Sequence, residues 1–330
     1  MRYYITTKSE WDKKLDQLLL SHTIFATVSN DLGLDFEFLR PADIDNIKYN
    51  CPRPVTSLKT FFLPPRENVT ADRDSDSPRI IIGAPNCDIE GLSLLDEIYL
   101  DRDFKDMFFN WRRKNTIIVA TDCFSYRDNC HCVSYGIKPF TTRIADMSVS
   151  QLNGTMIFRC ITDKGEAFIK TVINAQLLED KNFVESVENN NTEVEKTLTE
   201  KNKGLPDYAR SGKLLESAGK NIWKKYSSDC VSCGSCTTIC PTCSCFLLID
   251  KPGFEKVKQM DTCQYPGFER VAGGEDALYE LSERFRNRYM CKYVWKPKKY
   301  RSTACTGCGR CIDSCLGKIN KNELIMELVK

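Results

Sequence analysis

Two short runs of β-branched residues are the most apolar segments in the first half of the chain. Residues 79–83 and 116–120 each have the pattern of a fully buried strand. Between them, Asp88 is a candidate N-cap for a helix whose apolar positions recur near every 3.6 residues: Ile89, Leu92, Leu95 and Tyr99. Because a strand, a helix and a strand at this separation form a βαβ unit, the pattern predicts a parallel sheet.

The pattern changes twice further along the chain. A hairpin is predicted from strands at 155–161 and 166–170, with a turn at 163–165. Residues 185–203 are polar, which indicates either an exposed helix or a flexible linker. Apolar positions from Leu214 to Tyr226 then predict one amphipathic helix. We therefore expect an α/β domain with a mainly parallel sheet at 1–200, followed by a second domain at 201–330.

The number and position of the cysteines change this picture. The 330 residues include 47 basic and 45 acidic side chains, so the net charge suggests no nucleic-acid partner. No apolar run is long enough for a membrane span, and charged residues interrupt the place of a signal core. We therefore expect a cytoplasmic protein with no membrane partner. Of its 18 cysteines, 12 lie between Cys230 and Cys315, and in the cytoplasm such a density indicates thiolate ligands rather than disulfides.

These cysteines repeat one spacing twice. The first motif is Cys230, Cys233, Cys236 and Cys240, and the second is Cys305, Cys308, Cys311 and Cys315. This is the run of two-cluster bacterial ferredoxins, in which the fourth cysteine ligates the other [4Fe–4S] cube. One cluster is then expected on Cys230, Cys233, Cys236 and Cys315, and the other on Cys240, Cys305, Cys308 and Cys311. Zinc is the alternative, but tetrahedral sites built from Cys-x2-Cys pairs leave the last two cysteines of each motif unexplained.

The 64 residues between the two motifs are too many for a minimal ferredoxin hairpin. We expect this insert to pack as helices around the clusters, which gives an α-helical ferredoxin-like domain. Residues 284–301 contain eight Lys and Arg and no acidic residue. A solvated basic face is the default interpretation, and balancing the cluster charge or docking an acidic partner are the alternatives. Leu316 stands where the second motif usually has proline, which is expected to change hydrogen bonding but not ligation.

The first domain contains a further candidate site. Cys87 and Cys123 follow the two buried strands, so both should emerge at the carboxyl edge of a parallel sheet, where open α/β folds bind ligands. With Cys130 and Cys132 they would hold a third [4Fe–4S] cluster. The alternatives are that some of the four are merely buried thiols, or that the ligands come from Cys243, Cys245 and Cys263. Otherwise these three are expected to be small buried residues near the clusters.

The remaining candidates have plainer interpretations. Cys51, Cys160 and Cys291 are expected to be ordinary core or surface thiols. His131 is expected to be a polar loop residue, with a ligand or a hydrogen-bond donor to a cluster as the alternative. The sequence has no Gly-x-Gly-x-x-Gly fingerprint after a strand and no Walker A loop, and we assign no catalytic residue. The chemistry expected of the chain is therefore one-electron relay through iron–sulfur clusters.

The motifs also carry a family resemblance. The run at 230–246 resembles the iron–sulfur electron-transfer component of anaerobic sulfite reductase and the β subunit of cytosolic [NiFe] sulfhydrogenases, as do 261–263, 266–268, 272–274 and 284–289. In the first domain the likeness extends through 86–91, 95–100, Cys123 and 130–136. It implies an iron–sulfur subunit that carries electrons from an FAD- and [2Fe–2S]-containing NAD(P)H-oxidising subunit to a catalytic subunit. The catalytic subunit would be a siroheme sulfite reductase or a [NiFe] hydrogenase, and the shared motifs do not choose between them.

Two other functions are weighed against this one. The first is a self-sufficient iron–sulfur reductase acting on sulfite or polysulfide, with a cluster in the first domain open to substrate. The second is a structural or regulatory zinc protein.

Overall fold

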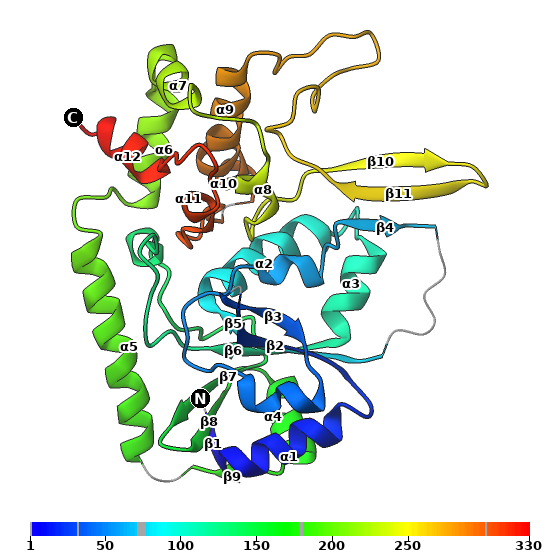
Figure 1. Cartoon of the computed structure of the whole chain (residues 1–330), viewed down its shortest axis with the longest axis vertical. Coiled ribbons are helices and arrows are strands. Elements are labelled where there is room, and N and C mark those ends of the chain that lie inside the picture. The colour runs from blue at the N-terminus through cyan, green and yellow to red at the C-terminus, as the bar shows by residue number, and fades with distance from the viewer. Residues whose placement is uncertain (1, 32, 71–76, 179–180, 301) are drawn as a thin grey trace.

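An eight-stranded sheet organises the first half of the computed structural model, which describes residues 2–31, 33–70, 77–178, 181–300 and 302–330 (Figure 1). The strand order is β3-β2-β5-β6-β7-β8-β1-β9. The strands are β1 (Arg2–Thr7), β2 (Thr23–Asn30), β3 (Gly33–Phe38), β5 (Arg79–Pro85), β6 (Thr116–Thr121), β7 (Met147–Leu152), β8 (Thr155–Cys160) and β9 (Gln176–Leu177).

The sheet is mixed, so the prediction of a mainly parallel sheet is wrong outside its centre. The pairs β2–β5, β5–β6 and β6–β7 are parallel, and the other four pairs are antiparallel. A tight turn at Asn153 and Gly154, both with positive φ, folds β8 back on β7. Two residues of this kind form the turn whose twist suits an antiparallel hairpin, which accounts for the change of direction.

The predicted βαβ unit is confirmed in the centre of the sheet. Strands β5 and β6 are parallel, and α2 (Asn86–Tyr99) and α3 (Met107–Lys114) connect them. Side chains alternate across β5, so Ile80 and Ile82 pack in a core with Trp11 of α1 (Lys8–Leu18). Ile81 faces the opposite core, against α2 and α3. The N-cap of α2 is Pro85 rather than Asp88, and the carboxylate of Asp88 makes a buried contact with the second domain.

The prediction of a second strand at 166–170 is wrong. Strand β8 is present, but its partner is β7, and Asp163–Phe168 forms helix α4. The side chain of Thr162 accepts a hydrogen bond from the N–H of Gly165 and so caps this helix. A π-helical turn, η4 (Ile169–Ile173), follows. The turn signal at Asn153 therefore decided the pairing, and not the predicted turn at 163–165.

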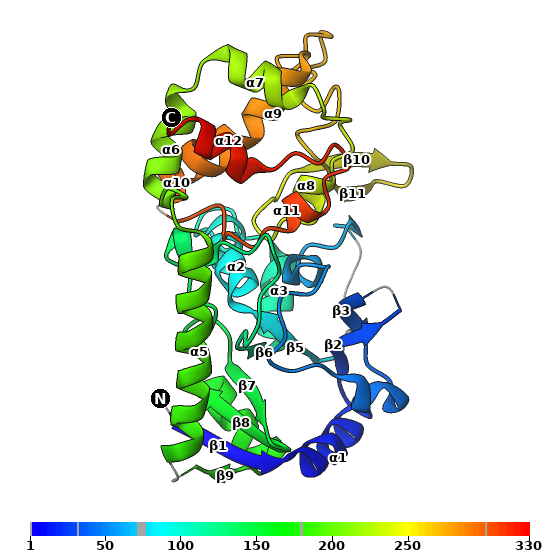
Figure 2. The ribbon, with the colours of Figure 1, turned by 60° about the vertical axis from the view of Figure 1, so that its left-hand side comes forward.

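The polar segment near residue 190 is a helix, as one of the two alternatives predicted. Helix α5 (Lys181–Lys201) runs along the first half of the molecule and leads into the second (Figure 2). Its buried positions recur at helical spacing and are Val187, Asn191, Val194 and Leu198. The one amphipathic helix predicted up to Tyr226 is instead two, α6 (Tyr208–Ser217) and α7 (Lys220–Ser227), separated at Ala218 and Gly219.

Helices surround the two cysteine motifs in the second half. Besides α6 and α7 they are α8 (Ser235–Thr238), α9 (Leu281–Met290), the π-helical turn η5 (Cys291–Trp295), α10 (Lys296–Tyr300), α11 (Arg310–Asp313) and α12 (Lys321–Glu327). Trp223, Phe285, Tyr289 and Leu324 pack in their common core.

The insert between the motifs is only partly helical, contrary to prediction. It begins with a hairpin of β10 (Phe246–Lys251) and β11 (Glu255–Met260), which projects from the body of the molecule in Figure 1. Strand β11 also pairs with β4 (Arg66–Asn68) of the first half, so the hairpin joins the two halves. Within the described ranges, no helix is both long and apolar enough to cross a membrane.

A fully buried ion pair also joins the two halves of the chain. Arg310 donates to both carboxylate oxygens of Asp88, one contact being 2.9 Å from Nη2 to Oδ2. The same guanidinium donates to the carbonyl oxygens of Pro54, Val55 and Thr56. Because both side chains are removed from water, losing one partner would leave an uncompensated buried charge.

We predict that Asp88→Asn destabilises the protein by about 3–5 kcal/mol, the cost of breaking a buried ion pair by removing one partner. Glu90→Gln is the matched control on the same helix, since its partner Arg143 is largely exposed and surface pairs contribute little. Calorimetry of the anaerobic protein should show a clearly lower Tm for Asp88→Asn alone. Equal melting of both variants and the wild type would contradict this account of the interface.

Candidate iron–sulfur sites

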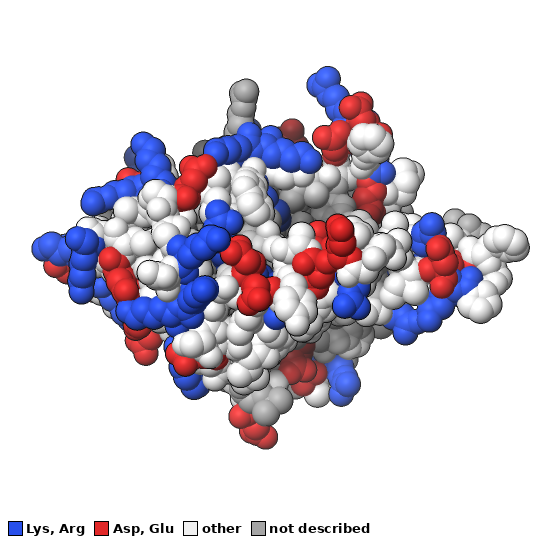
Figure 3. Space-filling model, turned by 90° about the horizontal axis from the view of Figure 1, so that it is seen from above, with Lys and Arg blue, Asp and Glu red and all other residues white. Residues whose placement is uncertain are grey.

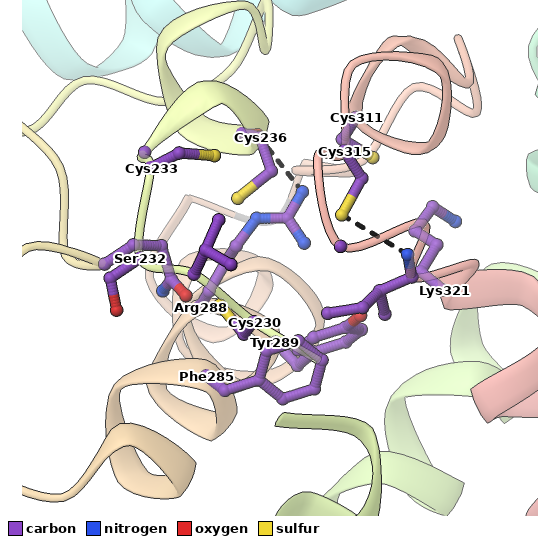
Figure 4. Close-up of a pocket in the computed structure, with 15 residues that line it drawn as sticks. Cys230, Ser232, Cys233, Cys236, Phe285, Arg288, Tyr289, Cys311, Cys315 and Lys321 are labelled. Carbon is purple, nitrogen blue, oxygen red and sulfur yellow. Dashed lines mark hydrogen bonds between the residues drawn. The ribbon is translucent and has the colours of Figure 1, made fainter. Parts of the chain in front are cut away.

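A cavity in the second half is lined by thiols from both motifs (Figure 4). Cys230, Cys233 and Cys236 of the first motif meet Cys311 and Cys315 of the second there. Phe285 and Tyr289 are apolar lining residues, and Cys233 is exposed at the surface. The structure therefore brings both Cys311 and Cys315 to the first three cysteines of the other motif, and crossed ligation requires this position of Cys315.

The backbone around this cavity is shaped for close approach. Ser232 and Gly234 both have positive φ, so the loop between the cysteines turns tightly. A Cβ on Gly234 would lie 2.6 Å from Cγ2 of Thr262 and 2.8 Å from Cε1 of Tyr265. The N–H of Ile319 donates to Sγ of Cys315 at 3.3 Å. An N–H to sulfur contact of this kind suits a thiolate ligand.

The fourth cysteine of the first motif lies beside the second motif. Sγ of Cys240 is 3.3 Å from Oγ1 of Thr242, and that hydroxyl donates to the carbonyl oxygen of Ala304 at 2.6 Å. Ala304 directly precedes Cys305, and both Cys305 and Cys308 are buried. Cys240 thus lies beside the second motif, and both Cys311 and Cys315 lie with the first three cysteines of the first motif.

The four candidate cysteines of the first half line one further cavity. Cys87 begins α2, Cys123 follows β6, and Cys130 and Cys132 come from the next loop. Arg53 lines the same cavity, and so does Leu198 of α5. These thiols thus converge beyond the carboxyl ends of β5 and β6, as expected from the sequence.

Cys87, Cys123, Cys130 and Cys132 form a third set of thiols. The loop that carries Cys130 and Cys132 is in direct contact with the loop of the second motif. The N–H of His131 donates to the carbonyl oxygen of Gly307 at 2.8 Å. Gly307 has a φ of +65°, and a Cβ there would lie 2.6 Å from Cα of Cys132. Cys308 lines the third cavity and Cys311 lines the first, so the set of the second motif lies between the other two. The three sets of thiols are therefore contiguous.

The electrostatics of the thiols differ between the sets. Burial raises the pKa of Cys87 and Cys123 well above the ordinary thiol value, and that of Cys236 to about 12. The pKa of Cys240 is instead lowered, by hydrogen bonding with Cys243 and then by the nearby ammonium of Lys292. Burial acts to raise the pKa of Cys305, but the ammonium groups of Lys321 and Lys292 lower it overall. Burial raises the pKa of Cys308, in the same set, to about 11, so the lowered pKa values are those of Cys240 and Cys305.

The basic segment that follows residue 283 is not simply a solvated face. Arg284, Arg288 and Lys292 recur every four residues and are buried, and half-buried Lys296 donates to the carbonyl oxygen of Thr242. The default interpretation is thus wrong for this stripe. Lys298 is exposed and pairs with Glu216 on the surface, where Lys and Arg are interspersed with Asp and Glu (Figure 3).

Several buried cations have thiols rather than carboxylates as neighbours. Among the described residues, no carboxylate lies within ion-pair distance of any of them: Lys59, Arg284, Arg288, Lys292 and Lys321. Nη2 of Arg288 donates to the carbonyl oxygen of Cys236, and Nζ of Lys59 donates to those of Thr237 and Thr238. A buried charge is stable only beside a compensating group. These cations fit an anionic, thiolate-bound group such as a [4Fe–4S] cluster.

His131 is fully buried and is not an ordinary polar loop residue. Its Nδ1 contacts the carbonyl oxygen of Asn129 at 2.8 Å, and Nζ of Lys321 lies 2.8 Å from its Nε2. Burial, and then the charge of Lys321, lower its pKa well below the usual range, so the ring is neutral. Neutral imidazole with Nδ1–H donating accepts from the ammonium at Nε2. Sequence reasoning missed this contact, because residue 321 is distant in the chain.

The other cysteines lie outside the three sets. Cys263 is buried as expected, but Cys243 and Cys245 are only half-buried, near Cys240 and at the base of the β10–β11 hairpin. Cys160 is buried in β8, Cys51 is half-buried, and Cys291 begins the π-helical turn. In the described ranges, no three His, Cys, Asp or Glu side chains close on one point as ligands of a single metal ion would.

Comparisons with known proteins agree with this arrangement. Residues 229–319 match a family model described as a 4Fe-4S dicluster domain. Sulfhydrogenase 2 subunit beta of Pyrococcus furiosus is 30% identical over 344 aligned positions, which span 99% of this chain and 98% of the relative. The chain belongs to the sulfhydrogenase β-subunit family. The dicluster domain indicates two [4Fe–4S] clusters, and membership of the family supports a role in iron–sulfur electron transfer.

The family assignment confirms the sulfhydrogenase part of the resemblance. It favours iron–sulfur clusters over zinc for the two motifs, because all eight of their cysteines fall within the matched residues. The similarity covers both halves of the chain, so the first half also belongs to the family pattern.

Proposed function

We propose that this sulfhydrogenase β-subunit family member relays electrons from an FAD- and [2Fe–2S]-containing NAD(P)H-oxidising subunit to a separate catalytic subunit. A [NiFe] hydrogenase is the catalytic partner favoured by the relative, whose name is that of a sulfhydrogenase subunit. A siroheme sulfite reductase is the second candidate, from the sequence resemblance alone. The observation that carries the proposal is the continuity of the three thiol sets through both halves of the chain. A cytoplasmic location stays a prediction.

The proposed ligands of the paired clusters follow the crossed arrangement. Cys230, Cys233, Cys236 and Cys315 would hold the first cluster, and Cys240, Cys305, Cys308 and Cys311 the second. The first cavity supports a ligand from the second motif in the first cluster, since Cys311 and Cys315 both line it. The choice of Cys315 follows the ferredoxin spacing. The contacts from Cys240 through Thr242 to Ala304 support the second.

A third [4Fe–4S] cluster is proposed in the first half, on Cys87, Cys123, Cys130 and Cys132. Three observations support it: the four thiols line one cavity, they come from the carboxyl edge of the sheet, and the cavity adjoins Cys308 of the second set. The four thiols also equal the number that one cube needs.

The chain itself supplies surroundings in which such clusters work. When bound, the clusters supply one-electron transfer, with potentials set by charge, hydrogen bonds to sulfur and exposure to solvent. The buried aromatic side chains of Phe285 and Tyr289 give the first site an apolar wall. The direct contact of Gly307 with Cys132 keeps the second and third sites close, and closeness is what rapid electron transfer requires.

We predict that the isolated chain, purified anaerobically, is reduced by dithionite but not by NADH or NADPH. The reason is that its sequence has no Gly-x-Gly-x-x-Gly fingerprint, and the proposal places the flavin in another subunit. Bleaching of the visible cluster absorbance is the measurement, and adding the flavin subunit should restore reduction by NAD(P)H. Rapid bleaching of the flavin-free chain by NADH would refute the relay role, and turnover of sulfite or polysulfide by the chain alone would favour a self-sufficient reductase.

We further predict about twelve iron atoms per chain, four for each of three clusters. Cys123→Ser should remove up to about four of them, or convert the third site to a three-iron form, and leave the paired clusters intact. Iron analysis together with electron paramagnetic resonance (EPR) measures both effects. Cys160→Ser is the control, because that buried thiol lies in β8 and outside the three sets. About eight irons at full occupancy in the wild type, with no change in Cys123→Ser, would remove the third cluster from the proposal.

A further inference from the structure

Lys292 makes the most direct contact between a buried cation and a proposed cluster ligand. Its Nζ donates to Sγ of Cys240 at 3.0 Å, to Oγ1 of Thr242 at 2.7 Å and to the carbonyl oxygen of Ala304 at 3.1 Å. The three donors of the ammonium group thus have three acceptors, and the side chain is buried. Hydrogen bonds from a charged donor are about twice as strong as neutral ones.

The backbone at Lys292 departs from a regular α-helix. The residue lies in the π-helical turn η5, between α9 and α10. In a regular α-helix, residues four apart are displaced by about 40° around the helix axis. Side chains repeated at this spacing therefore turn gradually away from the thiols that the first of them faces. The wider π turn reduces this drift. Lys292 and Lys296 both reach Thr242, the first at its hydroxyl and the second at its carbonyl oxygen. Such π turns are frequent at functional sites.

The other two sets of thiols receive no comparable contact among the described residues. Arg288, beside the first set, donates to the backbone oxygen of Cys236 and not to its sulfur. In the third set, Arg53 pairs with the carboxylate of Asp313 instead. The middle set is further distinguished by Lys321, whose ammonium lies 3.0 Å from the hydroxyl of Tyr293 and whose positive charge acts on Cys305.

We propose that Lys292 is a positioning residue that raises the reduction potential of the cluster on Cys240, Cys305, Cys308 and Cys311. This inference rests on the proposed function, since it assumes that the cluster is bound there. A reduced cluster carries one more negative charge than an oxidised one, and a fixed ammonium at a ligand sulfur stabilises the reduced form. The contact therefore favours residence of an electron on the middle cluster.

The test is an EPR-monitored redox titration of the anaerobic, cluster-loaded full chain. Cys240→Ser identifies the signal of the middle cluster, because that substitution changes one of its ligands. In Lys292→Met the reduction equilibrium constant of this cluster should fall at least tenfold, which corresponds to 59 mV for one electron. Lys292→Arg keeps the positive charge and should restore most of the shift.

Lys296→Met is the matched control, because Lys296 lies on the same stripe but donates to Thr242 and Ser244 rather than to a thiol. An unchanged potential in Lys292→Met with full iron content, or an equal shift in Lys296→Met, would overturn the inference. If Lys292→Met binds less iron, Lys292→Gln is titrated under the same criterion, since its amide is neutral. Paired clusters missing from the wild type would instead refute the proposed function.

Discussion

Thiolates gathered inside a protein must be compensated by bound metal, hydrogen bonds or buried positive charge, because an isolated charge in a low-dielectric interior is very costly. In this chain the compensation comes largely from one stripe at 284, 288, 292 and 296, together with Lys59 and Lys321. The helices that bear the stripe must lie against both cysteine motifs, and this requirement fixes the packing of the second half. The buried carboxylate of Asp88 pairs with another cation, Arg310, at the junction of the two halves.

The same constraint explains why the two halves form one unit. The third set of thiols belongs to the sheet domain, but Gly307 of the second motif packs against it without room for a side chain. Lys321 of the last helix contacts His131, which lies between two of the proposed third-site ligands. Charged contacts, close packing and the proposed clusters therefore all join the two halves of the chain. A relay needs this continuity, because each site must lie close to the next.

The sequence predicted what depends on local spacing. The β5–α2–β6 unit and the two cysteine motifs were recognisable because their signals lie within short segments. The pairing of β8 differs from the prediction because the chain reverses at Asn153 and Gly154. The β10–β11 hairpin is held partly by β4, some 190 residues away in the chain. The four-residue spacing of the basic stripe was visible in the sequence, but its burial depends on thiols brought from other segments. The neutral state of His131 likewise depends on Lys321, a distant residue.

The most direct test of the account is an anomalous diffraction map, collected at the iron edge from crystals of the anaerobically purified chain. We expect three iron clusters in a row, with Cys240 bound to the cluster of the second motif and Cys315 to that of the first. Lys292 should then lie against the middle cluster, with no carboxylate beside it. Iron groups ligated within each motif separately, or a signal at the zinc edge in place of iron, would contradict it.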